Sequence, residues 1–176
     1  MSGEAKNTFH FVTQVDLVEA TGQRARNVGE LFEILENAPG SVIYYHTHHF
    51  IKQHQFLTPE PPNDFAYWVT HILQDKQLGE QLSAIDPVRF PTLSALGEKI
   101  KEVGHRYLEK NPPIRNCPPG DEFHLMRSKS FILPTPYSAK NLSEFLECIK
   151  KISVRSLYHH IFQARLRLDK STNDFS

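Results

Sequence analysis

Four histidines fall within nine consecutive residues of this chain: His46, His48, His49 and His54. On a helix, His46 and His49 stand one turn apart and share a side. Two imidazoles at that spacing bind zinc, iron or manganese when carboxylates complete the ligand set. The sequence therefore offers a divalent metal as a candidate cofactor, held by His46, His49 and Asp64, with Asp75 as the alternative carboxylate.

The same region could instead form a metal-free acid–base site. In such a site His46 exchanges the proton, Asp64 orients the imidazole, and Tyr44 or Tyr45 acts as the donor. A structural interpretation competes with both chemistries, because His46 shares an apolar helix face with Ile43 and buried polar groups are normally hydrogen-bonded. The candidate catalytic residues are thus His46, Asp64 and Tyr44.

An internal repeat allows the two halves of the chain to be compared. Shifting the chain by 114 positions aligns residues 9–46 with residues 123–160 without a gap. Nine of the 38 pairs are identical, where ordinary composition predicts roughly two or three. The identical pairs are Phe9/Phe123, His10/His124, Thr21/Thr135, Ala25/Ala139, Asn27/Asn141, Glu30/Glu144, Glu33/Glu147, Tyr44/Tyr158 and His46/His160.

The second repeat keeps part of the candidate site. His160 and Asp174 take the places of the first repeat's histidine and aspartate, whereas Phe162 and Gln163 replace two later histidines. At most one histidine–aspartate pair is therefore duplicated.

A small anionic ligand is a third hypothesis. Arg165 and Arg167 alternate with leucines, and the planar guanidinium group suits phosphate and carboxylate. With His160 and Asp174 they are candidate ligand-binding residues for a sugar phosphate or a similar anion. The alternative is the solvated edge of an amphipathic helix.

Amphipathic helices are predicted to position these residues. The first repeat has an apolar stripe at i, i+3, i+4 and i+7, and the second repeat has the same stripe: Val28, Leu31, Phe32 and Leu35, then Leu142, Phe145, Leu146 and Ile149. Asn27 with Glu30 indicates an N-cap and its reciprocal partner, and Asn141 with Glu144 repeats the pattern.

Further helices are predicted after Asn63, around residues 78–85 and from Thr92. Short alternating stretches at residues 9–12 and 123–126 predict brief strands that pair with each other.

Composition narrows the function classes. Twenty basic residues balance twenty acidic ones, which argues against a nucleic-acid or anionic-membrane surface. No run of residues is apolar enough to span a membrane, and the N-terminus has no signal core. Two widely separated cysteines favour a reducing compartment, so we expect a cytoplasmic protein. The usual phosphate-loop, dinucleotide, nucleophile-elbow and H-E-x-x-H motifs are absent from the sequence.

Residues 41–50, the Gln53-His54-Gln55 triplet and residues 59–68 resemble a bacterial and archaeal family known as domain of unknown function 5752. The resemblance implies two related halves, each with a Ser-aliphatic-Tyr-aromatic-His segment followed by Asn-Asp-Phe. It carries no established activity, and it implies a gene-neighbourhood link to glycosyltransferases and storage sugars. The chain departs from the pattern by ending soon after the Asn-Asp-Phe at residues 173–175.

These observations predict a mainly α fold of two homologous helical repeats, each with a short N-terminal strand. Residues 8–110 form the first repeat, residues 111–120 a Pro-rich linker, and residues 121–176 a truncated second repeat. We expect a non-catalytic binding or regulatory module linked to carbohydrate metabolism; the alternative is a metal-dependent, hydrolase-like enzyme. A truncated repeat leaves an apolar helix face, so a protein partner or self-association is expected.

Overall fold

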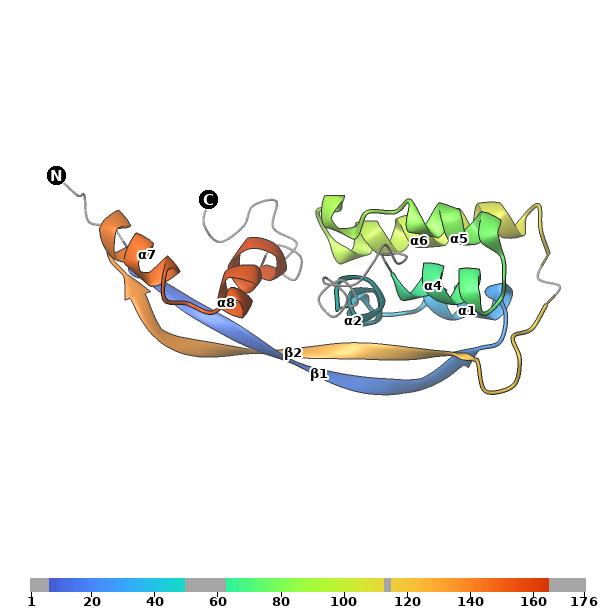
Figure 1. The fold of residues 1–176 in the computed structure, drawn as a ribbon, viewed down its shortest axis with the longest axis horizontal. Helices are drawn as coiled ribbons and strands as arrows, with labels where there is room; N and C mark the ends of the chain where they lie inside the picture. The colour runs from blue at the N-terminus through green and yellow to red at the C-terminus, as the bar shows by residue number, and fades with distance from the viewer. Residues whose placement is uncertain (1–6, 50–62, 113–114, 165–176) are drawn as a thin grey trace. The chain divides into compact units, whose positions relative to one another are not determined.

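The computed structural model describes residues 7–49, 63–112 and 115–164, without the side chains of His49, Phe162 and Gln163. Two strands of 17 residues each, β1 (Phe9–Ala25) and β2 (Phe123–Ala139), form a two-stranded sheet (Figure 1). The expectation of a mainly α protein is therefore wrong, because these long strands and the helices together make an α+β fold.

The helices follow each strand. After β1 come α1 (Val28–Glu36), α2 (Gly40–Tyr44), the π-helix η1 (Tyr45–His49), α4 (Asp64–His71), α5 (Lys76–Ser83), the 3₁₀ helix η2 (Pro87–Arg89) and α6 (Leu93–Leu108). After β2 come α7 (Leu142–Ile149), α8 (Val154–Tyr158) and the π-helix η3 (His159–Gln163). Within the described residues, no helix has both the length and the apolar character needed to cross a membrane.

The strands pair in antiparallel fashion. The Thr21 hydroxyl donates to the Leu125 carbonyl at 2.8 Å, and the Thr135 hydroxyl donates to the Phe11 carbonyl at 2.6 Å. The start of each strand therefore lies beside the end of the other. The predicted strands at residues 9–12 and 123–126 exist, but they are far longer than expected and these two stretches do not lie opposite each other.

Two prolines inside β2 explain why its length was not predicted. Pro134 and Pro136 lack an N–H and would break a central strand. In a two-stranded sheet, however, every second N–H of each strand faces away from the partner strand. The N–H of Met126 faces away from β1 in this way, since it donates to His46 of η1. Pro134 and Pro136 follow Met126 by an even number of residues, so their nitrogens face the same way. The prolines occupy positions where the ladder needs no donor.

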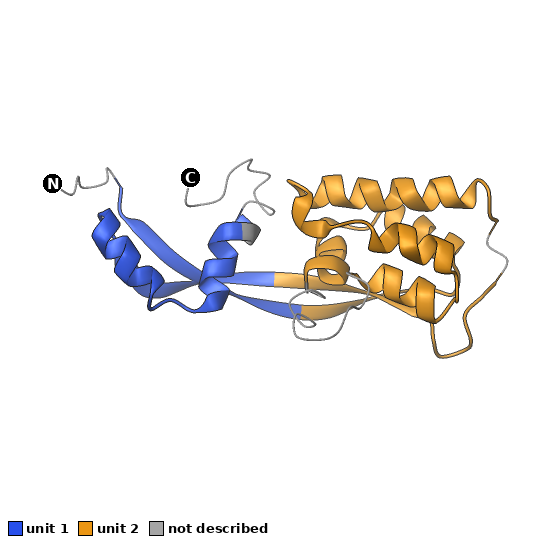
Figure 2. Cartoon of the chain, turned by 45° about the horizontal axis from the view of Figure 1, so that its top comes forward, with its two compact units in different colours: residues 1–17, 130–176 blue, residues 18–129 orange. Residues whose placement is uncertain are grey.

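The chain divides into two compact units (Figure 2). Unit 1 comprises residues 1–17 and 130–176, and unit 2 comprises residues 18–129. Each unit thus contains part of both strands. The predicted division at residues 8–110, 111–120 and 121–176 follows the sequence repeat, whereas these units follow packing, and the two divisions differ at the strands.

Unit 2 contains a continuous apolar core. The α1 stripe is fully covered, since Val28, Leu31, Phe32 and Leu35 are each at most 7% exposed. Helix α6 lies directly over it: a Cβ atom on Gly104 would stand 2.2 Å from the Phe32 ring. Only glycine allows this approach.

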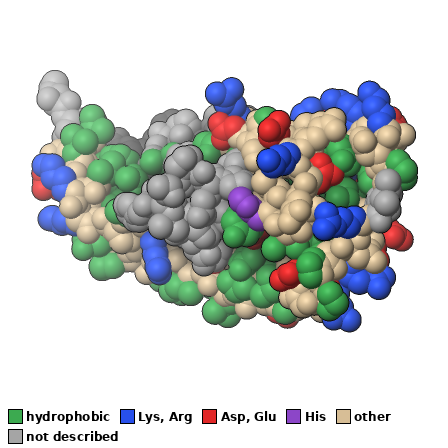
Figure 3. All heavy atoms as spheres, turned by 45° about the vertical axis from the view of Figure 1, so that its right-hand side comes forward, with side chains coloured by type: hydrophobic (Ala, Val, Ile, Leu, Met, Phe, Trp, Pro, Cys, Tyr) green, Lys and Arg blue, Asp and Glu red, His purple; other side chains and the backbone are tan. Residues whose placement is uncertain are grey.

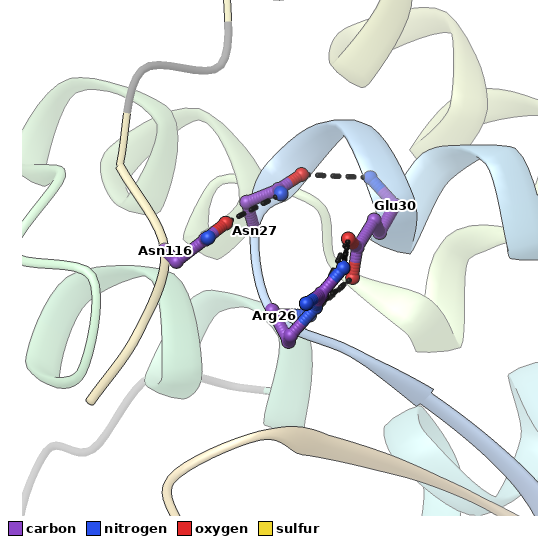
Figure 4. Close-up of polar contacts among 4 residues, drawn as sticks. All are labelled: Arg26, Asn27, Glu30 and Asn116. Atoms are coloured by element: carbon purple, nitrogen blue, oxygen red, sulfur yellow. Dashed lines mark hydrogen bonds and ion pairs between the residues drawn. The ribbon is translucent and has the colours of Figure 1, made fainter. Parts of the chain in front are cut away.

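Local signals for helix starts are confirmed. The Asn27 side chain accepts the Glu30 N–H, and Asn141 accepts the Glu144 N–H. The glutamate does not reach back to the cap residue's own N–H. Instead, Glu30 accepts the N–H of the residue before the cap, Arg26, and binds its guanidinium (Figure 4).

Candidate functional site

The His46 imidazole is buried at the junction of η1, α4 and β2. It is 2% exposed and packs against the rings of Phe65 and Phe123 at centroid distances of 5.3 and 4.7 Å. Nδ1 lies 2.7 Å from a carboxylate oxygen of Asp64, and Nε2 accepts the Met126 backbone N–H at 2.9 Å. Both ring nitrogens are therefore hydrogen-bonded.

This geometry determines the tautomer of His46. An Nε2 that accepts an N–H carries no proton itself, so the ring proton lies on Nδ1 and is donated to Asp64. Met126 lies on an edge of the two-stranded sheet, where backbone groups that face away from the other strand need partners. Asp64 also stands at the first turn of α4, where a negative charge is favourable. A metal at His46 would have to displace one of these two hydrogen bonds.

His160 has the equivalent place in unit 1. It is 2% exposed, and its Nε2 accepts the Val12 backbone N–H at 3.0 Å. Val12 and Met126 are themselves 114 positions apart, like the two histidines. Both histidines also stand in π-helices, which are rare and frequently occur at functional sites. The matching hydrogen bonds explain physically why the histidine occurs in both repeats.

A buried polar network in unit 1 was not anticipated. The Gln14 amide donates to Asp16 at 2.8 Å, and its carbonyl lies 2.9 Å from Nδ1 of His159. The Ser156 hydroxyl donates to the Val12 carbonyl at 2.6 Å. Burial, and secondarily the charge of Asp16, raise the pKa of Tyr158 to about 12. Only the neighbouring duplicated histidine could have drawn attention to this cluster in the sequence.

The other predicted site residues are not gathered into one cluster. Tyr44 is 5% exposed and stacks on the imidazole of His48 at 5.6 Å, whereas burial and then Asp64 raise the pKa of Tyr45. The His49 side chain is not described. Among the described residues, no group of three His, Cys, Asp or Glu side chains has a geometry suited to a metal ion.

The candidate anion-binding residues Arg165, Arg167 and Asp174 lie outside the described residues. Of the four residues predicted to bind a ligand, the structure therefore places only His160.

Helix α7 differs sharply from its counterpart α1. Its stripe is open: Leu142 is 70% exposed and Leu146 is 52% exposed, while Val154 at the start of α8 is 81% exposed. Only Phe145 and Ile149 are partly covered. Figure 3 shows hydrophobic side chains on the surface of unit 1, at the left of the view. We call the surface formed by Leu142, Leu146 and Val154 the open face.

The repeat relates the open face to a known packing site. The positions equivalent to Leu146 and Val154 are Phe32 and Gly40, and both contact α6 in unit 2. A Cβ atom on Gly40 would stand 3.5 Å from Leu93. The open face therefore corresponds to the α6-binding surface of unit 2, and within the described part of unit 1 no helix covers it.

The comparisons with known proteins agree with this architecture. A family model described as "Family of unknown function (DUF5752)" matches residues 6–176. The solved structure "The structure of OrfY from Thermoproteus tenax" is similar, with a TM-score of 0.85 and 27% sequence identity. The match covers 98% of this chain and 78% of that one. A comparison with curated proteins finds no match.

Proposed function

This chain belongs to the DUF5752 family of unknown function, and from its own surface we propose that it is a non-catalytic binding module. Its open face takes an amphipathic helix of another protein. The observation that carries the proposal is the contrast between a buried stripe on α1 and an exposed stripe on its repeat counterpart α7. Exposed apolar patches of this kind mark interaction sites.

Helix α6 shows what kind of helix fits. It packs on α1 and α2 with glycines at the closest approaches, Gly104 against Phe32 and Gly97 against Ile43. It also places Ile100 and Val103 in the core. A partner helix should therefore combine small and branched aliphatic residues along one stripe.

Charged residues beside the apolar stripe distinguish the open face from the α6-binding surface of unit 2. In unit 2, Glu36 of α1 lies 2.6 Å from His105 of α6. The equivalent position is Lys150, directly after α7, and its ammonium lies 2.7 Å from a carboxylate oxygen of Glu147 on that exposed helix. Lys151 and Arg155 add positive charge nearby. The partner helix should thus carry an acidic residue where α6 has His105.

A second copy of the chain is the less suitable occupant. Its α6 is already packed against its own α1, so the described residues of a copy offer no free helix of that type. An enzyme of carbohydrate metabolism, regulated through this contact in the cytoplasm, is the partner class that the family resemblance suggests. The free thiols of Cys117 and Cys148 suit such a reducing compartment.

The hydrolase alternative gains no support from the described residues. Both ring nitrogens of His46 are hydrogen-bonded to Asp64 and Met126, and they serve to join three elements.

A designed peptide tests the proposal. It copies residues 92–109, which span α6 and its caps, and replaces His105 by Glu. A covalent i,i+4 staple joins positions 98 and 102 on the exposed side of the helix, because an isolated helix of this length is otherwise costly to nucleate. We expect saturable binding to the full chain by fluorescence anisotropy, tighter than that of the peptide retaining His105. Leu142→Asp with Leu146→Asp should weaken binding by at least about tenfold, since two leucines lose their burial.

The control is Val88→Asp, which places one such aspartate on an exposed valine of unit 2 and is compared with each leucine substitution made singly as well as with the pair. Binding that survives the double substitution, or that falls equally in the Val88 variant, would rule out the open face. Sedimentation velocity provides a second test. A concentration-dependent dimer abolished by Leu146→Asp would identify a second copy as the occupant and contradict the proposal.

A further inference from the structure

A second candidate binding site lies in unit 2, independent of the open face. Here the residues leading into α5, the end of α6, residues 110–112 and Arg115 surround a hollow of about 590 Å³. This volume lies within the roughly 300–1,000 Å³ range of small-molecule pockets.

Positive charge dominates its rim. Lys76, Lys110 and Arg115 line the hollow, and within the described residues none of the three forms an ion pair. Among the described residues of the lining, Asp75 carries the only carboxylate, and both of its oxygens are used. One accepts the Leu78 N–H at the start of α5, and the other accepts the Tyr107 hydroxyl. The local excess of positive charge is therefore available to an anion.

The segment that carries Arg115 is anchored beside the hollow. Asn116 accepts a hydrogen bond from the Asn27 side chain at 2.8 Å (Figure 4), and the Cys117 N–H donates to the Arg26 carbonyl at 2.7 Å. Arg115 is thus held next to the start of α1, where Val28 also lines the hollow. The exposed Arg115 guanidinium is planar and suits bidentate contact with a phosphate group.

Neutral groups complete the lining. Gln74 and Gln77 present carboxamides, which both donate and accept hydrogen bonds and so suit hydroxyl groups. Leu73 and Leu108 supply apolar wall. A ligand that fits all these groups has an anionic end and a hydroxylated body of small-molecule size.

Another hollow in unit 2 shows that this charge pattern is not general. It measures about 640 Å³, but its arginines, Arg24 and Arg26, are matched by Glu30 and Glu33. Arg26 is also paired directly with Glu30 at 2.7 Å. That hollow has no excess charge with which to select an anion.

We infer that the hollow lined by Lys76, Lys110 and Arg115 binds a small organic phosphate whose body carries hydroxyl groups. The phosphate group contacts the cations, and the carboxamides of Gln74 and Gln77 bind the hydroxyl groups.

Isothermal titration of the full chain tests this inference with four probes: glucose 6-phosphate, glucose, inorganic phosphate and citrate. We expect glucose 6-phosphate to bind best, because it alone supplies both the phosphate and the hydroxylated body. Lys110→Glu with Arg115→Glu should weaken its binding by at least about tenfold, as expected for loss of charge-assisted hydrogen bonds.

The matched control is the double variant Arg24→Glu with Arg89→Glu, which makes the same charge change at exposed cations of unit 2 outside this hollow. It should bind glucose 6-phosphate as the wild type does, and both double variants should retain the wild-type melting temperature within a few degrees. Equal loss in the control would show non-specific charge attraction and overturn the site. Inorganic phosphate or citrate binding as well as glucose 6-phosphate would overturn the assignment of a hydroxylated organic phosphate. Failure here with success of the α6-like peptide would leave the proposed function intact, since the two surfaces share no residue.

Discussion

At the scale of single residues, the duplicated histidine acts as a connector between secondary-structure elements. Each accepts one N–H from a sheet edge, at Met126 in unit 2 and at Val12 in unit 1. A two-stranded sheet has no third strand to satisfy such groups, so a side chain from a helix must do so. His46 also fixes the start of α4 through Asp64.

Removal of the His46 side chain should therefore reduce stability strongly. His46→Ala leaves the Met126 N–H and the Asp64 carboxylate without this partner and opens a cavity beside Phe65 and Phe123. We expect the free energy of unfolding to fall by about 2–4 kcal/mol, measured by urea denaturation. His124→Ala is the control, because His124 is an exposed histidine on β2, the strand that carries Phe123 and Met126. Equal stability of the two variants would contradict the connector role.

At the scale of elements, pairing of the two strands is reinforced by charge in unit 2. Glu19 of β1 lies 2.9 Å from Arg127 and 3.1 Å from Lys129 of β2. These two hydrogen-bonded cations, Arg127 first, lower the pKa of Glu19 to about 2. The three side chains are between 38% and 57% exposed, so screening by water and salt keeps the effect small.

The pH dependence follows from the sign of that shift. A carboxylate whose pKa is lower in the folded than in the unfolded chain adds stability above its ordinary pKa of 4.5, and this contribution disappears as the pH falls from there towards 2. The melting temperature should therefore fall less in Glu19→Gln than in the wild type when the pH is lowered from 5 to 2.5. Circular dichroism at low salt measures this difference. Glu80→Gln controls for the loss of one exposed charge. An identical acid response in wild type and Glu19→Gln would disprove the contribution of this pair.

At the scale of the whole molecule, neither repeat supplies all the residues of its own unit. The core of unit 2 includes Cys117, Phe123 and Leu125, which follow the helices of the first repeat. The Trp68 indole N–H donates to the Asp121 carbonyl at 2.8 Å. The folding unit therefore extends beyond the sequence repeat.

Two fragments test this dependence. Residues 8–110 contain the first repeat alone and lack all these contacts, so we expect no cooperative thermal transition. Residues 8–129 add the first part of β2 and should unfold cooperatively, because they restore the Met126 N–H and the apolar residues of that strand. Differential scanning calorimetry distinguishes the two cases. A cooperative transition of residues 8–110 at the wild-type temperature would show that β2 is dispensable to unit 2.

What the sequence determined is mostly local. The stripe of α1, the caps at Asn27 and Asn141, and the starts of α4 and α6 could be predicted because capping and amphipathic periodicity act within a few residues. The sequence also suggested that Asp64 orients His46, and the structure places them 2.7 Å apart. The hydrogen bond that Nε2 of His46 accepts from Met126 could not be predicted, since Met126 lies 80 residues away in the sequence.

Three features were decided only by the tertiary structure: the length of the strands, the division of each strand between the two units, and the two candidate binding surfaces. The contacts of Thr21 and Thr135 across the sheet span 104 and 124 residues, a range over which sequence periodicity carries no information. The open face has the same stripe as α1, and only the position of α6 determines which of the two stripes is covered. Exposure is a property of the neighbours of a helix, so it could not be read from the helix itself.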